Sequence, residues 1–219
     1  MKGQLILLFM TLGIIANAQQ KNETFYKDNI LSKEVTEKKA KFKKVETTDP
    51  NGIVNVKIFD LKKDCLIKEK NFKDNKPFGI WTTFSEDCSI LNKRDFSKLI
   101  YSDKQIDTLF NNVIEEGNPN NFKKAQYGND ENDIFKYLAN NLKYPREAIN
   151  EGLSGTVYLQ LIITADGTVK MYSIIRGAHP FLDYESWELV SNMPKWNPAK
   201  KDGQPIDSFW NLPIRFSLK

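Results

Sequence analysis

A clear alternation of side chains between two faces over positions 157–164 is the feature that most limits how this chain can fold. The side chains on one face of a strand would be Val157, Leu159, Leu161 and Ile163. Those on the other face would be Tyr158, Gln160, Ile162 and Thr164. Ala165-Asp166-Gly167 follows, and Asp-Gly is a strong signal for a tight hairpin turn. The pattern therefore predicts a β-hairpin whose return strand covers 169–176.

Helical patterns lie on both sides of this hairpin. Asp133 is expected to cap a helix that runs to about Leu142. Tyr144-Pro145 interrupts it, because the residue before a proline is pushed out of the helical region, and a second short helix is expected over 146–150. A third helix should begin after His179-Pro180, and a last strand should cover 208–218, after a polar loop over 201–205. Helices gathered on one face of a small antiparallel sheet predict an α+β fold with three strands and two main helices, the short helix over 146–150 not being counted.

The first residues have the three parts of a secretory signal peptide. Lys2 supplies a positive charge, an apolar run covers 5–16, and Ala16-Asn17-Ala18 places small residues where a signal peptidase cleaves. The alternative is an uncleaved membrane anchor. The twelve-residue run would span only about 18 Å as a helix, against a hydrocarbon core of about 30 Å. We therefore expect cleavage after Ala18 and a periplasmic protein, with an inner-membrane anchor facing the periplasm as the alternative.

Two regions that differ in composition and residue pattern follow the predicted signal peptide. Residues 19–50 are polar and rich in lysine, and the lysines of 33–44 alternate with glutamates, which favours a polar leader with one short, solvated helix. Residues 51–100 contain two similar stretches, 59–72 and 84–96, each with an aromatic residue, an Asp-Cys turn, a charged strand and a closing Phe. Repeats this short predict stacked β-hairpins. This region is similar to MORN-type repeats, because Pro77, Gly79 and Trp81 stand in the order of that pattern.

Cys65 and Cys88 stand at matching turns of these two stretches. An even number of cysteines in an exported chain makes a disulfide the default. Such a bridge would close a loop of about 23 residues and stabilise the fold by roughly 3 kcal/mol. A metal site is disfavoured, because two thiols and the distant His179 do not fill a zinc shell.

Residues 101–122 are expected to form a linker with a short helix over 103–116, and the C-terminal domain is expected over 123–219. From residue 125 onward the chain resembles the C-terminal domain of TonB energy transducers. The resemblance is carried by Tyr127-Gly128, Asn140-Asn141-Leu142-Lys143-Tyr144-Pro145, Ala148, Gly155-Thr156-Val157-Tyr158, Asp166-Gly167, Arg176-Gly177, His179-Pro180, Leu182-Asp183, Pro194-Lys195-Trp196-Asn197-Pro198-Ala199 and Leu212-Pro213-Ile214-Phe216.

The resemblance implies a protein-binding role in transmembrane transport. It implies that an extended segment of an outer-membrane TonB-dependent transporter, or of another envelope protein, adds to the exposed last strand. In the family, glutamines ahead of the Tyr-Pro pair are associated with transporter contact, and Asn141 and Lys143 hold those places here. The implied protein-binding residues are Asn141, Lys143, Tyr144, Pro145, Ser208, Phe209, Trp210, Asn211, Leu212, Ile214, Arg215 and Phe216.

Other functions find little support in the sequence. The carboxylate pairs Asp183 with Glu185 and Glu115 with Glu116 have no nucleophile or histidine at a useful spacing, so we expect no enzyme activity. No phosphate loop or metal motif is present, and we expect no cofactor, metal or small-molecule substrate. The net charge of +4 is modest and mixed in sign, which does not suggest a nucleic-acid partner. The alternatives to transporter binding are a structural or homodimerising protein and an anchored transducer.

Overall fold

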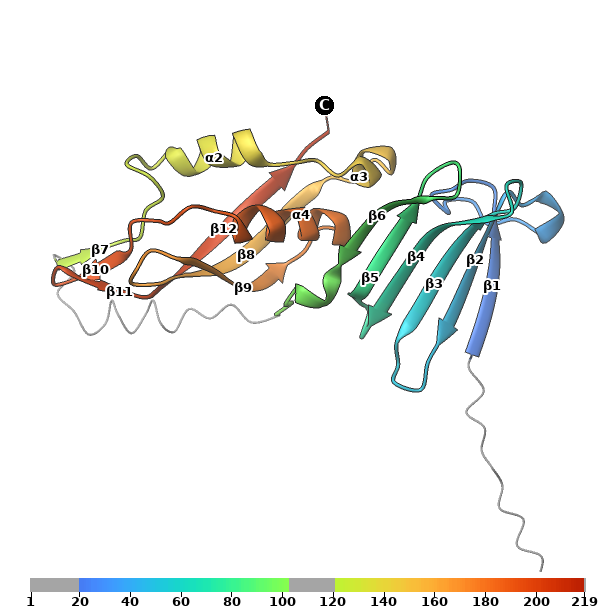
Figure 1. Cartoon of the computed structure of the whole chain (residues 1–219), viewed down its shortest axis with the longest axis horizontal. Coiled ribbons are helices and arrows are strands. Elements are labelled where there is room, and N and C mark those ends of the chain that lie inside the picture. The colour runs from blue at the N-terminus through green and yellow to red at the C-terminus, as the bar shows by residue number, and fades with distance from the viewer. Residues whose placement is uncertain (1–19, 103–120, 219) are drawn as a thin grey trace, which may run out of the picture. The chain divides into compact units, whose positions relative to one another are not determined.

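The computed structural model describes residues 20–102 and 121–218, which form two compact units (Figure 1). Of these residues, the first unit comprises 20–76 and 83–91, and the second comprises 77–82, 92–102 and 121–218. The predicted signal peptide over 1–18 and the predicted helix over 103–116 lie outside the described residues, and the predicted domain limits stay a prediction. Within residues 20–102 and 121–218, no helix is both long enough and apolar enough to cross a membrane.

Six strands follow one another along the chain in a single sheet, in the order β1-β2-β3-β4-β5-β6. Their bounds are β1 (Gln20–Tyr26), β2 (Phe42–Thr48), β3 (Val54–Asp60), β4 (Cys65–Lys73), β5 (Lys76–Phe84) and β6 (Ile90–Asp95). The pairs β1–β2, β2–β3 and β3–β4 are antiparallel. Val56 and Ile58 of β3 are buried, as the alternation of this strand predicts.

The helix predicted within residues 33–44 is wrong. Only Glu37–Lys39 (η1) is helical, as a single 3-10 turn, and strands β1 and β2 form on either side of it. Lys43 lies over the ring of Phe59 at 5.5 Å, and Lys44 lies over the ring of Tyr26 at 5.8 Å, so the lysines cover aromatic side chains of the sheet. Pairing of β2 with a neighbour on each side outweighs the weak local helical pattern.

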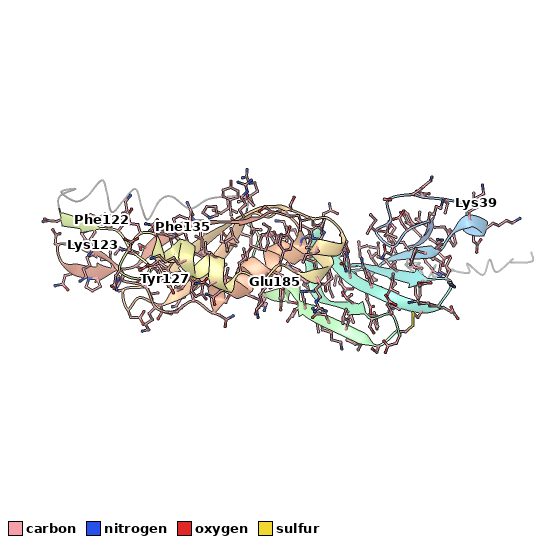
Figure 2. All side chains as sticks on the ribbon, turned by 90° about the horizontal axis from the view of Figure 1, so that it is seen from above. Lys39, Phe122, Lys123, Tyr127, Phe135 and Glu185 are labelled. Carbon is pink, nitrogen blue, oxygen red and sulfur yellow. A yellow bond between two sulfur atoms is a disulfide. The ribbon has the colours of Figure 1, made fainter. Side chains whose placement is uncertain are left out.

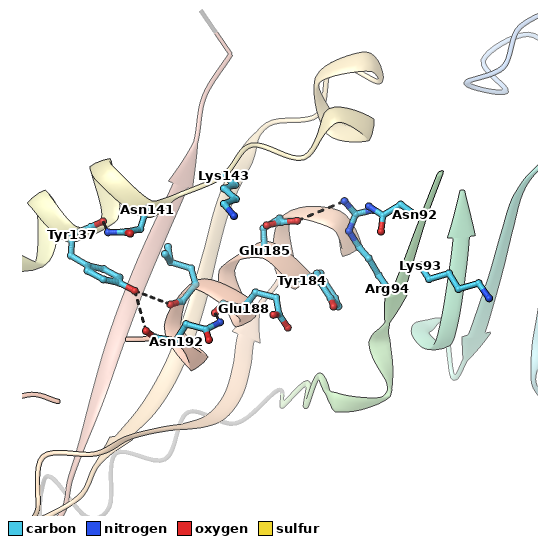
Figure 3. A pocket seen from close by; sticks show the side chains of 11 residues that line it. Asn92, Lys93, Arg94, Tyr137, Asn141, Lys143, Tyr184, Glu185, Glu188 and Asn192 are labelled. Atoms are coloured by element: carbon cyan, nitrogen blue, oxygen red, sulfur yellow. Dashed lines mark hydrogen bonds and ion pairs between the residues drawn. The ribbon is translucent and has the colours of Figure 1, made fainter. Parts of the chain in front are cut away.

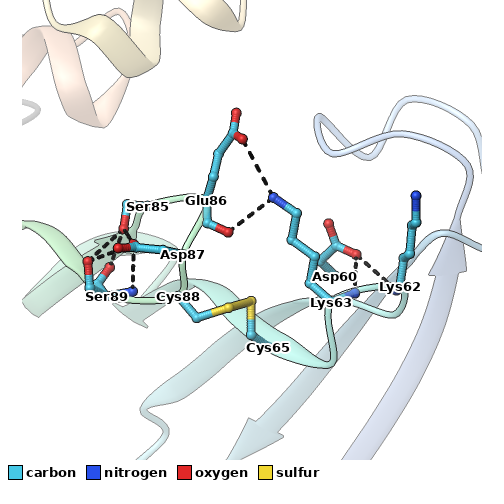
Figure 4. Close-up of a disulfide and its surroundings, with 9 residues drawn as sticks. All are labelled: Asp60, Lys62, Lys63, Cys65, Ser85, Glu86, Asp87, Cys88 and Ser89. Carbon is cyan, nitrogen blue, oxygen red and sulfur yellow. Dashed lines mark hydrogen bonds and ion pairs between the residues drawn. A yellow bond between two sulfur atoms is a disulfide. The ribbon is translucent and has the colours of Figure 1, made fainter.

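The predicted disulfide between Cys65 and Cys88 is confirmed, with the two Cα atoms 6.0 Å apart (Figure 4). It joins the first residue of β4, which directly follows one turn, to the turn between β5 and β6. In this second turn the Asp87 carboxylate accepts hydrogen bonds from the Ser85 hydroxyl and from the hydroxyl and backbone N–H of Ser89, which lower the pKa of Asp87. The Lys63 amine also donates to the Glu86 carbonyl at 3.1 Å, so the two turns are tied together at a second point.

The second unit confirms the predicted α+β class. Its main sheet has the order β12-β8-β9 and is antiparallel throughout. The strands are β8 (Gly155–Ile163), β9 (Val169–Arg176) and β12 (Ser208–Phe216), and the helices are α2 (Asp133–Asn141), α3 (Arg146–Asn150) and α4 (Pro180–Ser191). Each of these elements falls where the sequence pattern predicts it. The expected cap is wrong, because Asp133 is the first residue of α2 and its carboxylate accepts from the N–H groups of Asn129 and Asp130, before the helix.

Helix α4 packs on β8 and β9 and covers the apolar face of the sheet. The core contains residues that are fully buried or nearly so, namely Val157, Leu159, Leu161, Ile163, Ile174, Phe181, Leu182, Val190 and Ile214. Each buried aliphatic side chain of this size contributes about 1.5 to 3 kcal/mol relative to exposure. The hydrophobic face of the predicted hairpin therefore becomes the centre of the unit.

A second small sheet was not predicted. It has the order β11-β10-β7 and consists of β7 (Phe122–Lys123), β10 (Ala199–Lys201) and β11 (Gln204–Ile206). The segment expected as a polar loop over 201–205 is thus the tip of a hairpin. Asp202 and Gly203 have positive φ values of 51° and 79°, as a tight two-residue turn requires. Strands of two or three residues are too short to show an alternating pattern, so only the turn carried a signal.

Residues 77–82 and 92–102 contribute to the core of the second unit. Phe96, which is 1% exposed, lies 4.5 Å from the ring of Trp81 and 5.2 Å from the ring of Tyr184 on α4. Trp81 in turn lies edge-on to Phe181, at 5.9 Å. The α4 side of the C-terminal sheet is therefore completed by chain that precedes residue 103.

Candidate functional site

The last strand, β12, forms one edge of the main sheet. It pairs with β8 along its whole length, from Ser208 opposite Ile163 to Phe216 opposite Gly155. No other strand of the described residues pairs with its outer side. Pro213 lies within this strand, and a proline, which has no N–H to donate, is tolerated in a sheet where that position faces away from the neighbouring strand.

Pro213 also indicates which backbone groups of β12 point outward. The N–H and C=O of one residue in a strand point to the same side, and those of the next residue point to the other side. Asn211 and Arg215 share the parity of Pro213, so their backbone groups face the open edge. Their side chains are exposed, whereas the side chains of Leu212 and Ile214 are buried in the core. The edge can thus offer backbone hydrogen bonds without disturbing the core.

The opposite edge of the sheet, along β9, is partly occupied. Residues 100–102 run parallel to β9, and Tyr101 forms a bridge with Ile174. The Ile174 N–H donates to the Ile100 carbonyl at 2.7 Å, and the Ser102 N–H donates to the Ile174 carbonyl at 3.1 Å. Sequence analysis missed this segment, although its apolar run Leu99-Ile100-Tyr101 was a signal for a short strand.

A buried carboxylate holds this edge segment in place. The Tyr101 hydroxyl donates to an Asp183 carboxylate oxygen at 3.0 Å, and the Ala178 N–H donates to the other at 2.9 Å. Asp183 is only 3% exposed, and burial raises the pKa of its carboxyl to about 6, against the lowering effect of these hydrogen bonds. Burial and the adjacent carboxylate raise the pKa of Tyr101. Asp183 therefore has a structural role at the β9 edge.

The predicted residues Tyr144 and Pro145 lie at one end of β12. The Tyr144 ring lies edge-on to Phe216, with centroids 5.4 Å apart, and its hydroxyl donates to the Leu153 carbonyl at 2.5 Å. Pro145 is buried and precedes the first residue of α3. The structure therefore brings this pair together with the last residue of the predicted edge.

Asn141 and Lys143 lie elsewhere, at a cavity of about 480 Å³ that we call the α4 groove (Figure 3). Its floor is a half-buried stripe of α4, one side is formed by α2 and the loop after it, and the other side is formed by residues 92–94 of β6. The Asn141 amide donates to the Tyr137 carbonyl at 2.9 Å, and the Tyr137 hydroxyl lies 3.4 Å from the Asn192 carbonyl. The structure thus divides the predicted loop residues between two places.

A buried ion pair borders the α4 groove. The Arg94 guanidinium binds both carboxylate oxygens of Glu147, at 2.6 and 3.1 Å, and Arg94 and Glu147 are 7% and 8% exposed. Arg94 also lies 3.7 Å from the Glu185 carboxylate on α4. Burial raises the pKa of Glu185, and Arg94 opposes that shift. The Arg94 guanidinium therefore interacts with two carboxylates, those of Glu147 and Glu185, at the β6 side of the α4 groove.

Two other residues singled out in the sequence have structural roles. The His179 ring accepts a hydrogen bond from the Phe181 N–H at the start of α4, as a capping side chain does. Trp196 is 4% exposed and contacts the rings of Tyr127 and Trp210.

Phe135, on α2 (Figure 2), is a large apolar side chain that the second unit leaves 64% exposed. Among residues 20–102 and 121–218, no group of three or more His, Cys, Asp or Glu residues is placed to hold a metal ion.

Part of the chain matches a known family of proteins. The family model described as Gram-negative bacterial TonB protein C-terminal matches residues 140–218, from the end of α2 through β12. The match supports the resemblance found in the sequence over this segment, which includes the sheet edge and the Tyr-Pro loop, and associates it with envelope transport. No curated protein and no solved structure matches the chain.

Proposed function

We propose that this protein is a periplasmic binding module that takes up an extended segment of an envelope protein along the outer edge of β12. A transporter of the outer membrane that depends on TonB is the first candidate partner, and transmembrane transport is the process. The observation that carries the proposal is the asymmetry of the main sheet: β12 ends it without a described neighbour, whereas β9 is bridged by Tyr101. The family match to residues 140–218 supports the class of partner.

Strand addition suits this edge for physical reasons. An unpaired sheet edge is a template for another extended chain, and its backbone hydrogen bonds supply affinity with little dependence on the side chains of the partner. Asn211 and Arg215 would each offer an N–H and a C=O, and Pro213 would offer a C=O. Tyr144, packed on Phe216, would border the end of the added strand.

The test uses the chain without residues 1–18 and a panel of peptides from the periplasmic N-termini of outer-membrane transporters. Arg215→Pro removes one outward N–H, whereas Arg215→Ala removes the same side chain and keeps that N–H. We expect isothermal titration to show a roughly fivefold weaker affinity for Arg215→Pro than for Arg215→Ala, as loss of one hydrogen bond implies. Equal affinities for the two variants would contradict strand addition at this edge.

A homodimer sealed along β12 is the competing arrangement. Light scattering at increasing concentration would then give twice the mass of one chain, and peptides would compete with self-association. We expect a monomer across the concentrations used for the titration. A dimer that Arg215→Pro dissociates and that no peptide displaces would favour the structural role over transporter binding.

A further inference from the structure

The α4 groove has the dimensions and boundaries of a site for an extended chain. Its floor carries Glu185 and Glu188 of α4 and Asn192, the residue that caps the end of this helix (Figure 3). Amide side chains of Asn92, Asn141 and Asn192 line it from three different elements. A volume of about 480 Å³ lies within the range of binding pockets, and amide groups bind the peptide groups of a ligand well.

One wall of the groove is itself a sheet edge. β6 comes last in the order of the six-stranded sheet, and no other strand of the described residues pairs with its outer side. Asn92, Lys93 and Arg94 of this strand line the groove. An extended segment lying along α4 could therefore form backbone hydrogen bonds with β6, which is the same chemistry as at β12 but at a different edge.

The charges of the groove indicate what the segment should carry. Arg94 is held by both oxygens of Glu147 and reaches Glu185 only at 3.7 Å, so two carboxylates share one guanidinium. The Glu185 side chain is 18% exposed. Glu188 has its own partner in Lys98. Lys93 and Lys143 are exposed at the rim. Lys143 acts on Glu185 less strongly than Arg94 does, because water screens an exposed charge, so the partly buried Glu185 dominates recognition.

We propose that the α4 groove binds an extended, basic segment of a partner protein, which adds to the edge of β6 and places an ammonium or guanidinium group against Glu185. The added cation would give Glu185 a close partner of its own and leave the Arg94–Glu147 pair intact. The site is distinct from the β12 edge, and the proposal does not depend on transporter binding there.

The experiment titrates short, capped threonine peptides with one central residue into the isotopically labelled chain without residues 1–18. Threonine favours extended structure and adds no charge. The central residue is lysine, norleucine or glutamate. We expect chemical-shift changes at Asn92, Glu185 and Asn192 with the lysine peptide, and an affinity roughly fivefold lower for norleucine and lower again for glutamate.

Variants and a modified peptide separate the two parts of the proposal. Glu185→Gln should weaken binding of the lysine peptide roughly fivefold and leave the norleucine peptide unchanged, whereas Glu131→Gln, at an exposed residue outside the groove, should have no effect. Methylation of alternate peptide nitrogens should abolish binding when it removes the donors directed at β6.

The proposal would be overturned by equal affinity for the lysine and glutamate peptides, by no effect of Glu185→Gln, or by full binding by every N-methylated peptide. Arg215→Pro serves as the reference for the β12 edge. Binding in the groove should survive this substitution, so failure of the groove proposal and failure of the proposed function give different results. Loss of groove binding in Arg215→Pro would place the peptide at β12 and contradict the proposal.

Discussion

At the scale of single residues, buried charges carry the most testable consequences in this protein. Asp183 and the Arg94–Glu147 pair both hold segment 92–102 to the C-terminal sheet. A buried charge that loses its partner is expensive, and a buried acid with a raised pKa couples folding to pH. Both effects can be measured by unfolding in urea.

Asp183 should make stability fall as pH rises. Its pKa is about 6 in the folded state and near 3.8 when unfolded, so between these values the folded state binds more protons. The contribution is fully present below about pH 4 and is lost as pH rises through 6, by about 2 kcal/mol. Asp183→Asn should remove this loss, whereas Glu131→Gln should leave the profile unchanged. Unfolding free energies measured from pH 4 to 7 test this, and a profile unchanged by Asp183→Asn would contradict it.

Arg94→Met should destabilise the second unit by about 3 to 5 kcal/mol, because it leaves the Glu147 carboxylate buried without its partner. Arg94→Met combined with Glu147→Met should recover most of that loss, because no buried charge remains. A double-mutant cycle built on urea unfolding gives the coupling. If the double variant proves no more stable than Arg94→Met alone, packing of the arginine stem rather than its charge is what matters at this position.

At the scale of elements, the sequence predicted the helices and strands whose ends and buried faces are set by residues within the same segment. α2, α3, α4, β8, β9 and β12 were all predicted, since proline at α3 and α4, Asp-Gly at the hairpin and the two-faced alternation in β8 act locally. The segment that contains β1 and β2 was predicted to be a polar leader with a short helix, because its alternating lysines and glutamates fit the period of a helix as well as that of a strand. β7, β10 and β11 are too short to have a pattern.

The disulfided turn offers a test at this scale. Cys88 has φ of 67°, a left-handed conformation that favours glycine, so this position combines a bridge with an unfavourable backbone. Cys65→Ser with Cys88→Ser should cost about 3 kcal/mol through the lost loop constraint. Cys65→Ser with Cys88→Gly should be about 1 kcal/mol more stable than that variant, because glycine adopts this conformation without strain. Urea unfolding of both double variants decides, and equal stabilities would show that the backbone at this turn relaxes.

At the scale of the whole molecule, the second unit draws on chain far from the family match. Residues 140–218 match the family model. Side chains from outside this segment pack on its helices α3 and α4, namely Trp81, Arg94 and Phe96. The β9 edge is also occupied from outside it, by residues 100–102. The sheet therefore depends on residues 77–102 for part of its core and for the difference between its two edges.

Two fragments test this dependence. We expect residues 123–218 to be less stable than residues 92–218 by several kcal/mol, because Phe96 and Leu99, at 1% and 8% exposure, each contribute about 1.5 to 3 kcal/mol. The shorter fragment should also associate, since its β9 edge is open. Urea unfolding and light scattering measure the two effects. Equal stability and a monomeric 123–218 fragment would mean that segment 92–102 contributes little to this unit.

The candidate site was predicted only in part, for a physical reason. Proline, alternation and hairpin turns act within a few residues, so the sequence alone determined β12 as a strand, Tyr144-Pro145 as a helix break and Cys65 with Cys88 as a pair. Which sheet edge is open depends on contacts between residues far apart in the chain, such as Tyr101 with Ile174 and Asp183. The same holds for the α4 groove, where Arg94 meets Glu147 and Glu185. Only the tertiary structure decided those pairings, because no local pattern records which distant partner satisfies a buried charge or a backbone group.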